Sequence, residues 1–243
     1  MCSIFKTWSS SDSLGKNTSS PAAETADRFS ALGGVFLTEP PALAARLDAV
    51  RGLVFDWDGV FNRGVKGAAA ASTFSEADSM GTNMLRYGLW RMRDALPACA
   101  IITGESNDSA RLLAEREHFD ALYQGVRDKG EAIEQFCSEH GLARDELACV
   151  FDDINDLGMA AGCAVRILVR RNASPLLQNF LVREGLCDYI TASQADGYAV
   201  REAAELLLGL MGVFDAVVQS RTAVDDDYER YFAARQAVNT VLR

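Results

Sequence analysis

LVFDWDGV, residues 53–60, places three bulky apolar residues directly before two acidic ones. A short apolar run of this kind is typical of a strand buried on both faces of a sheet. Asp56 and Asp58 are two positions apart, so both carboxylates can reach one ligand if the chain turns beyond the strand. Gly59 has the conformational freedom for that turn. The segment therefore predicts a buried strand that ends in two acids.

Short apolar runs alternate with helical patterns on the C-terminal side of this segment. Further strands are expected at residues 98–102, 121–123, 148–151, 165–169 and 189–191. Helices are expected between them, at residues 82–95, 106–117, 128–140, 157–161 and 175–183. The alternation predicts an α/β fold, a doubly wound (Rossmann-like) parallel sheet with helices on both faces. Such a sheet binds ligands beyond the carboxyl ends of its strands.

Three parts are expected along the chain. Residues 1–32 are rich in Ser, Thr, Asn and Ala and predict a poorly ordered N-terminal extension. Residues 33–210 would form the sheet domain, and residues 211–243 a C-terminal helical extension.

Composition sets the class of protein. Hydrophobic residues make up 49% and charged residues 24%, as in soluble globular proteins. The net charge of −10 argues against binding to nucleic acid or anionic membranes. No apolar run is long enough to span a membrane and no signal pattern opens the chain, so a cytoplasmic location is expected. Six cysteines without a CxxC pair indicate reduced, buried thiols.

Polar residues follow four of the expected strands. They are Asp56 and Asp58, then Thr103 and Gly104, then Lys129, and last Asp152, Asp153 and Asp156. Clustered carboxylates need a cation, and hard oxygen ligands favour Mg²⁺. The cation, Thr103 and Lys129 would hold and neutralise a phosphoryl group, leaving one carboxylate to attack phosphorus.

These motifs resemble those of the haloacid dehalogenase superfamily. DWDGV at residues 56–60 is similar to its first motif, Thr103 to its second, Lys129 to its third and DDIND at residues 152–156 to its fourth. The resemblance spans about residues 50–210 and is strongest to the capless branch of the 3-deoxy-manno-octulosonate 8-phosphate phosphatases. That branch is further indicated by IITG at 101–104, LYQG at 122–125, DYIT at 188–191 and AVRE at 199–202.

The resemblance implies a catalytic role for each of these residues. Asp56 would be the nucleophile and form an aspartyl-phosphate, and Asp58 would act as general acid and base. Asp56, Asp152 and the backbone carbonyl of Asp58 would bind Mg²⁺. Thr103, Gly104 and Lys129 would bind phosphate, while Asp153 and Asp156 would hold metal-bound water or orient Lys129.

The resemblance also implies an architecture. The chain between Lys129 and Asp152 is filled by one helix and one strand, so no large cap domain is expected there. A short flap at about residues 61–74 would cover the site instead. The resemblance also implies a homotetramer, in which a neighbouring subunit helps to close the site.

Three departures from the pattern bear on the substrate, which is expected to be a small sugar phosphate or sugar-acid phosphate. Phe151 replaces a glycine and predicts altered packing rather than lost metal binding. Glu105 and Ala77 stand where the branch carries arginines. We therefore expect a substrate other than the octulosonate phosphate itself.

Three other interpretations of these residues are open. A receiver domain also has clustered Asp, Thr and Lys on a doubly wound sheet, but its paired acids come first along the chain. A catalytically silent binding or scaffold protein would explain Phe151 and Glu105. Phosphoryl transfer to an acceptor other than water is equally compatible with the residues.

Overall fold

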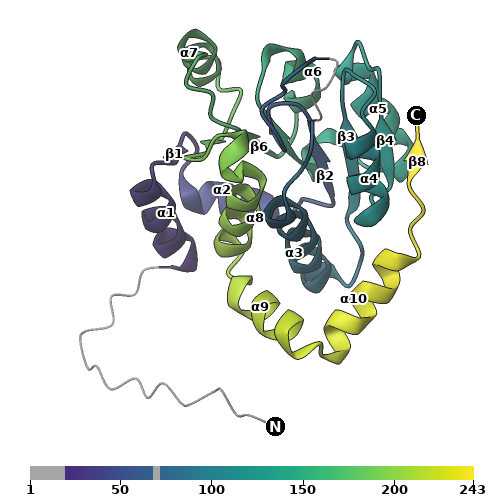
Figure 1. The fold of residues 1–243 in the computed structure, drawn as a ribbon. Helices are drawn as coiled ribbons and strands as arrows, with labels where there is room; N and C mark the ends of the chain where they lie inside the picture. The colour runs from purple at the N-terminus through teal and green to yellow at the C-terminus, as the bar shows by residue number, and fades with distance from the viewer. Residues whose placement is uncertain (1–19, 68–71) are drawn as a thin grey trace.

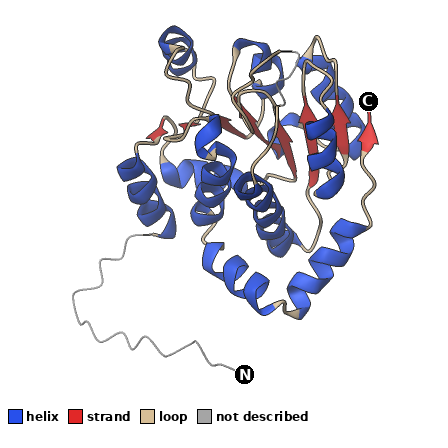
Figure 2. Ribbon diagram, in the orientation of Figure 1, coloured by secondary structure: helices blue, strands red, loops and turns tan. Residues whose placement is uncertain are grey.

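The computed structural model describes residues 20–67 and 72–243. Its centre is an eight-stranded sheet in the order β1-β7-β6-β5-β2-β3-β4-β8 (Figures 1 and 2). The strands are β1 (Val35–Phe36), β2 (Gly52–Phe55), β3 (Ala98–Ile102), β4 (Ala121–Tyr123), β5 (Leu147–Phe151), β6 (Val165–Leu168), β7 (Tyr189–Ile190) and β8 (Val241–Leu242). Neighbouring strands are parallel except β1 and β7, so the predicted α/β class is confirmed.

Helices cover both faces of this sheet. The helices of the described residues are α1 (Pro21–Leu32), α2 (Pro40–Leu47), α3 (Glu76–Arg93), α4 (Asp108–Arg116), α5 (Lys129–His140), α6 (Leu157–Ala160), α7 (Pro175–Arg183), α8 (Ala199–Leu210), α9 (Phe214–Ala223) and α10 (Asp226–Gln236). Because side chains alternate along a strand, β2 contributes to two cores. Leu53 and Phe55 pack in the core that α3 and α8 cover, and Val54 packs in the core under α5 and α6.

The order of the strands fixes where the sheet is open to a ligand. The chain runs from β2 outward through β3 and β4, then returns to the other side of β2 for β5, β6 and β7. The direction of winding therefore reverses between β2 and β5, which are paired in register from Gly52–Leu147 to Phe55–Val150. Crevices form at such a switch point, beyond the carboxyl ends of the strands.

The N-terminal prediction needs a correction. Residues 1–19 lie outside the described residues, but Pro21–Leu32 form helix α1 rather than a poorly ordered extension. Ser20 caps this helix, and Gly33 ends it in the left-handed conformation. Ala22 and Ala26 are buried, and α1 packs on α8 because small residues on α8, such as Gly209 beside Thr25, allow close approach.

The C-terminal segment contains a strand in addition to the predicted helices. After α9 and α10 the chain reaches the far edge of the sheet, where β8 pairs in parallel with β4 (Figure 1). Helix α10 is fixed by the ion pair between Arg235 and Glu117, 2.5 Å apart and nearly inaccessible to solvent.

The expected flap, at about residues 61–74, falls partly on residues 68–71, which lie outside the described residues. Residues 63–67 on its near side have no regular secondary structure. The cysteines in the described part of the chain are all buried, as predicted, and none of them forms a disulfide there.

No single helix in the described ranges is long and apolar enough to cross a bilayer. Helices α8 and α9 meet the length and composition criteria only together, and the chain bends by 109° between them.

Candidate active site

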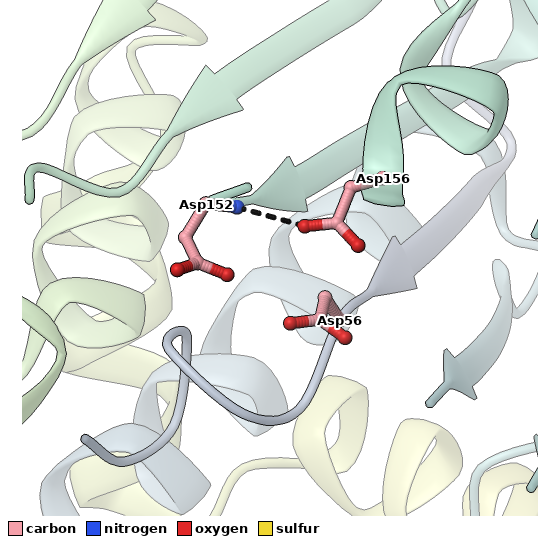
Figure 3. Close-up of side chains that lie close together, drawn as sticks. All are labelled: Asp56, Asp152 and Asp156. Atoms are coloured by element: carbon pink, nitrogen blue, oxygen red, sulfur yellow. Dashed lines mark hydrogen bonds between the residues drawn. The ribbon is translucent and has the colours of Figure 1, made fainter. Parts of the chain in front are cut away.

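Three carboxylates meet at the switch point of the sheet. Asp56 follows β2 and Asp152 follows β5, while Asp156 comes from the 3-10 turn Ile154–Asp156 just beyond. Each offers an oxygen atom, and these atoms all lie within 4.8 Å of one another. Figure 3 shows the three side chains directed toward one space. All three are at most 4% exposed, so the protein holds them away from water.

The local hydrogen bonds explain why the acids converge. The backbone N–H of Asp56 donates to the carbonyl of Val150 (3.0 Å), which ties the end of β2 to β5. One carboxylate oxygen of Asp156 accepts from the N–H groups of Asp152 (3.1 Å) and Asp153 (3.0 Å). Asp156 therefore closes the turn after β5 and leaves its other oxygen for a neighbour.

Lys129 is that neighbour. It is the first residue of α5, which Asp128 caps by accepting from the N–H of Gly130 at 2.8 Å. Its ammonium group donates to Asp156 at 2.6 Å and to Asp56 at a still shorter distance. The lysine is only 6% exposed, so it is a buried counter-ion shared by two carboxylates.

The acids outnumber the cation, and their pKa values reflect this. Burial raises the pKa of Asp56, and Asp156 raises it further, while Lys129 opposes both. Burial likewise raises the pKa of Asp152, and the Asp56 and Asp156 carboxylates add to the shift. For Lys129, burial lowers the pKa, but Asp56 and Asp156 outweigh it and raise the pKa above the ordinary value. A bound cation would offset the remaining repulsion among these acids.

The donor set fits a divalent cation. Oxygen Oδ1 of Asp152 is buried and accepts no hydrogen bond from any described residue, although a buried acceptor normally has a partner. A hard cation among carboxylate oxygens would satisfy that atom. The cluster of Asp56, Asp152 and Asp156 can therefore bind a metal ion.

Thr103 and Gly104 complete the same pocket from β3. Thr103 is buried, and its backbone bonds both to the last residue of β4 and to the chain beyond it: its N–H donates to the carbonyl of Tyr123 (2.9 Å), and its carbonyl accepts from the N–H of Val126 (3.1 Å). Every residue predicted for the site lines one cavity of about 470 Å³; they are Asp56, Asp58, Thr103, Gly104, Lys129, Asp152, Asp153 and Asp156.

Asp58 lines this cavity together with Lys66. Its carboxylate contacts the ammonium group of Lys66. Trp57, between the two acids, points the other way and is fully buried, stacked on Phe61 with ring centroids 5.1 Å apart. Alternation along the chain thus sends both acids toward the pocket and the indole into the core.

The two unusual residues noted in the sequence lie in different surroundings. Phe151 is fully buried in the core under α5 and α6, and its carbonyl accepts from Val169 at 2.7 Å, so it continues β5 without entering the pocket. Glu105 is exposed and lines the cavity. The acid therefore lies where a substrate would enter.

Sequence reasoning missed three basic residues near the acids. Lys66 and Arg127 line the cavity, and Arg171, just after β6, contacts Asp152 and Asp153. Arg171 follows a predicted strand at the same edge of the sheet, so the rule that identified the acids would also have identified this arginine.

No family model matches the chain. Solved structures do resemble it. A putative HAD superfamily (subfamily III A) hydrolase from Legionella pneumophila is 25% identical with a TM-score of 0.62, over 75% of this chain and 94% of that chain. A putative 3-deoxy-D-manno-octulosonate 8-phosphate phosphatase from Vibrio cholerae is 26% identical with a TM-score of 0.60, over 72% and 92%.

The same fold occurs in the 3-deoxy-D-manno-octulosonate 8-phosphate phosphatase from Moraxella catarrhalis, whose structure contains magnesium, phosphate and KDO. It is 24% identical with a TM-score of 0.61, over 73% of this chain and 97% of that chain. These likenesses and the strand-end motifs agree. The resemblance of the chain to the haloacid dehalogenase superfamily, and within it to the 3-deoxy-D-manno-octulosonate 8-phosphate phosphatases, is thereby confirmed.

Proposed function

We propose that this chain is a Mg²⁺-dependent phosphomonoester hydrolase that acts through an aspartyl-phosphate on Asp56. The observation that carries the proposal is the convergence of three buried carboxylates with Lys129 at the switch point, in one cavity with Thr103. Many of the structurally similar proteins are named phosphatases, which supports the same reaction.

Asp56, Asp152 and the backbone carbonyl of Asp58 would hold the cation, with Asp153 and Asp156 supporting it. When bound, the cation supplies positive charge that offsets the charge of the phosphoryl oxygens. Thr103, the backbone at Gly104 and Lys129 would donate hydrogen bonds to those oxygens. Lys129 is already held in place by Asp156, so little reorganisation is needed when substrate binds.

The reaction would proceed in two steps. A carboxylate oxygen of Asp56 forms a bond to phosphorus while the ester P–O bond breaks, and Asp58 gives its proton to the departing oxygen. Asp58 then takes a proton from water as the water oxygen attacks phosphorus. The bond between Asp56 and phosphorus breaks, which releases inorganic phosphate and restores both acids.

The substrate is proposed to be a small sugar phosphate or sugar-acid phosphate. Glu105 lines the cavity and would repel the carboxylate of a sugar acid. Ala77, where the resemblance implies an arginine, supplies no positive charge. We therefore expect a neutral sugar phosphate to have a higher kcat/KM than the octulosonate 8-phosphate. A clear preference for the octulosonate would refute this specificity and leave the phosphatase reaction intact.

The direct test is release of phosphate from p-nitrophenyl phosphate in the presence of Mg²⁺. The wild-type chain should release phosphate, and Asp56→Asn should lose at least about 10³-fold in kcat because the nucleophile is gone. Asp145→Asn makes the same change at an exposed position and should retain full activity. Wild-type protein that binds sugar phosphates without hydrolysing any phosphomonoester would instead be a silent binding protein.

The expected homotetramer and cytoplasmic location stay predictions. Light scattering on the purified chain measures the oligomeric state, and fractionation of the source cells determines the location.

A further inference from the structure

Arg171 contacts the two acids that follow β5, although it comes from the chain beyond the neighbouring strand β6. It lies in the loop after β6, and its guanidinium donates to Asp153 at 2.8 Å and to oxygen Oδ2 of Asp152 at a shorter distance. The loop is fixed at this point, because the carbonyl of Arg171 accepts from the N–H of Ser174 and the side chain of Gln178, both at 3.1 Å. Arg171 therefore forms a fork that bridges two adjacent carboxylates.

This ion pair is packed against the turn that carries Asp56 and Asp58. A Cβ atom added at Gly59 would lie 2.1 Å from Oδ2 of Asp152 and 2.6 Å from Nη2 of Arg171. Both atoms thus occupy space that only a glycine leaves free. The position of the Asp152 carboxylate is defined on one side by the arginine and on another by the backbone of this turn.

The two oxygens of Asp152 consequently have different surroundings. Oδ2 is held by Arg171, whereas Oδ1 is buried and has no hydrogen-bond partner among the described residues. In Figure 3 the Asp152 side chain points toward Asp56 and Asp156. Those two carboxylates repel it, so a counter-ion on the opposite side is needed to keep it in the cluster.

We infer that Arg171 is a positioning residue for the cation site: it holds one oxygen of Asp152 so that the other faces Asp56 and Asp156. The inference rests on the part of the proposed function that assigns a divalent cation to this cluster. Hydrogen-bonded partners of metal ligands fix the orientation of the ligands in this way.

An arginine near the site would also repel a cation, so the two effects oppose each other. The repulsion is reduced here because the same guanidinium is paired with Asp153, whose charge offsets its own. Arg171 also contacts the oxygen that has a partner, not the free one. The orienting effect should therefore dominate, and loss of Arg171 should weaken cation binding.

Binding of Mn²⁺ to the full-length protein tests this directly, because free Mn²⁺ is counted by electron paramagnetic resonance without any turnover. Arg171→Gln should raise the Kd for Mn²⁺ by about 10-fold or more. Arg171→Lys keeps the charge but not the fork, and its Kd should lie between those of the wild type and Arg171→Gln. Arg170→Gln is the matched control, since Arg170 donates to carbonyl groups of Thr191 and Gly33 rather than to acids. Its Kd should equal that of the wild type.

A Kd in Arg171→Gln that is unchanged or lower would overturn the inference, and a lower value would mean that repulsion dominates. Thermal unfolding in EDTA shows whether each variant is folded. If Arg171→Gln is not folded, Arg171→Lys carries the test, and it should bind Mn²⁺ more weakly than the wild type. Failure of the proposed function gives a different result from failure of this inference. If Mn²⁺ binding depends on Arg171 but the wild-type chain releases no phosphate, only the proposed function is refuted.

Discussion

The ammonium nitrogen of Lys129 lies 2.6 Å from a carboxylate oxygen of Asp156, and both side chains are almost completely buried. The same nitrogen contacts Asp56. One lysine therefore compensates two desolvated acids that follow different strands. It links the end of β2 to the turn after β5 before any ligand is bound.

Replacing Lys129 by Met should cost stability as well as activity. Removing one partner from a buried ion pair leaves an unpaired buried charge, which costs about 3–5 kcal/mol. We expect that loss in the free energy of unfolding, measured by urea denaturation in EDTA, together with loss of phosphatase activity. Arg127→Met removes an exposed charge nearby and should change stability by no more than about 0.5 kcal/mol. Equal stability of Lys129→Met and wild type would show that the two acids do not need this lysine.

Removing the divalent cation should abolish hydrolysis and lower stability. A ligand that binds only the folded state adds about 2.7 kcal/mol when its concentration is about 100 times its Kd. Thermal unfolding should therefore shift upward when Mg²⁺ is added to EDTA-treated protein. Asp152→Asn removes a proposed ligand and should show almost no shift. A shift of full size in that variant would place the cation elsewhere.

Gly59→Ala should damage the site through a clash rather than through backbone strain. Gly59 has φ +100°, and an added Cβ would overlap the Asp152 carboxylate. Gly141→Ala separates the two effects: Gly141 has φ +62°, but nothing lies within 4 Å of its added Cβ. Both variants should lose about 1–2 kcal/mol from the left-handed conformation, measured by urea denaturation. Only Gly59→Ala should lose phosphatase activity, by at least about 10-fold; comparable activity in the two variants would contradict the close packing.

Asp78 should make stability depend on pH. Its carboxylate is fully buried and accepts from Ser75 (2.6 Å) and from the N–H of Arg201 (2.9 Å). Burial raises its pKa in the folded chain above the ordinary 3.8, against these hydrogen bonds. The folded state then holds this proton more tightly than the unfolded state, so stability falls as pH rises above 3.8 toward the folded pKa.

Asp78→Asn is neutral at every pH and can keep both hydrogen bonds. Its stability relative to the wild type should therefore increase as pH rises above about 4, measured by urea denaturation at each pH. Glu76→Gln, on the exposed side of the same helix turn, should show no such trend. A constant difference between Asp78→Asn and wild type would mean that burial does not control this group.

How far the sequence predicts the structure depends on how long each pattern is. The central strands were found because several apolar residues come together. The edge strands β1 and β8, of two residues each, are not indicated by the sequence, because their pairing partners β7 and β4 are far away along the chain. Helix α3 was expected from residue 82, yet it begins at Glu76, where Ser75 caps it. Its first turns pack closely on α8 through small residues, as Gly81 does beside Arg201, so their buried face does not look hydrophobic.

The candidate site followed from position at strand ends, so the acids, Thr103 and Lys129 were all located. Arg171 also follows a predicted strand, but its contact with Asp152 is long-range, and no sequence pattern indicates that contact. Docking of α10 through Arg235 and Glu117 was invisible for the same reason. Long-range ion pairs join segments whose sequences give no sign of each other.

The fluorescence of Trp57 should report ligand binding at the site. Trp57 lies between the two acids in the sequence, and its indole is fully buried and stacked on Phe61. Replacing Trp8 and Trp90 by Phe would leave it as the sole source of tryptophan emission. Short-wavelength fluorescence from such a protein, altered in intensity as the neighbouring carboxylates acquire a ligand, would give a binding signal without dye or substrate.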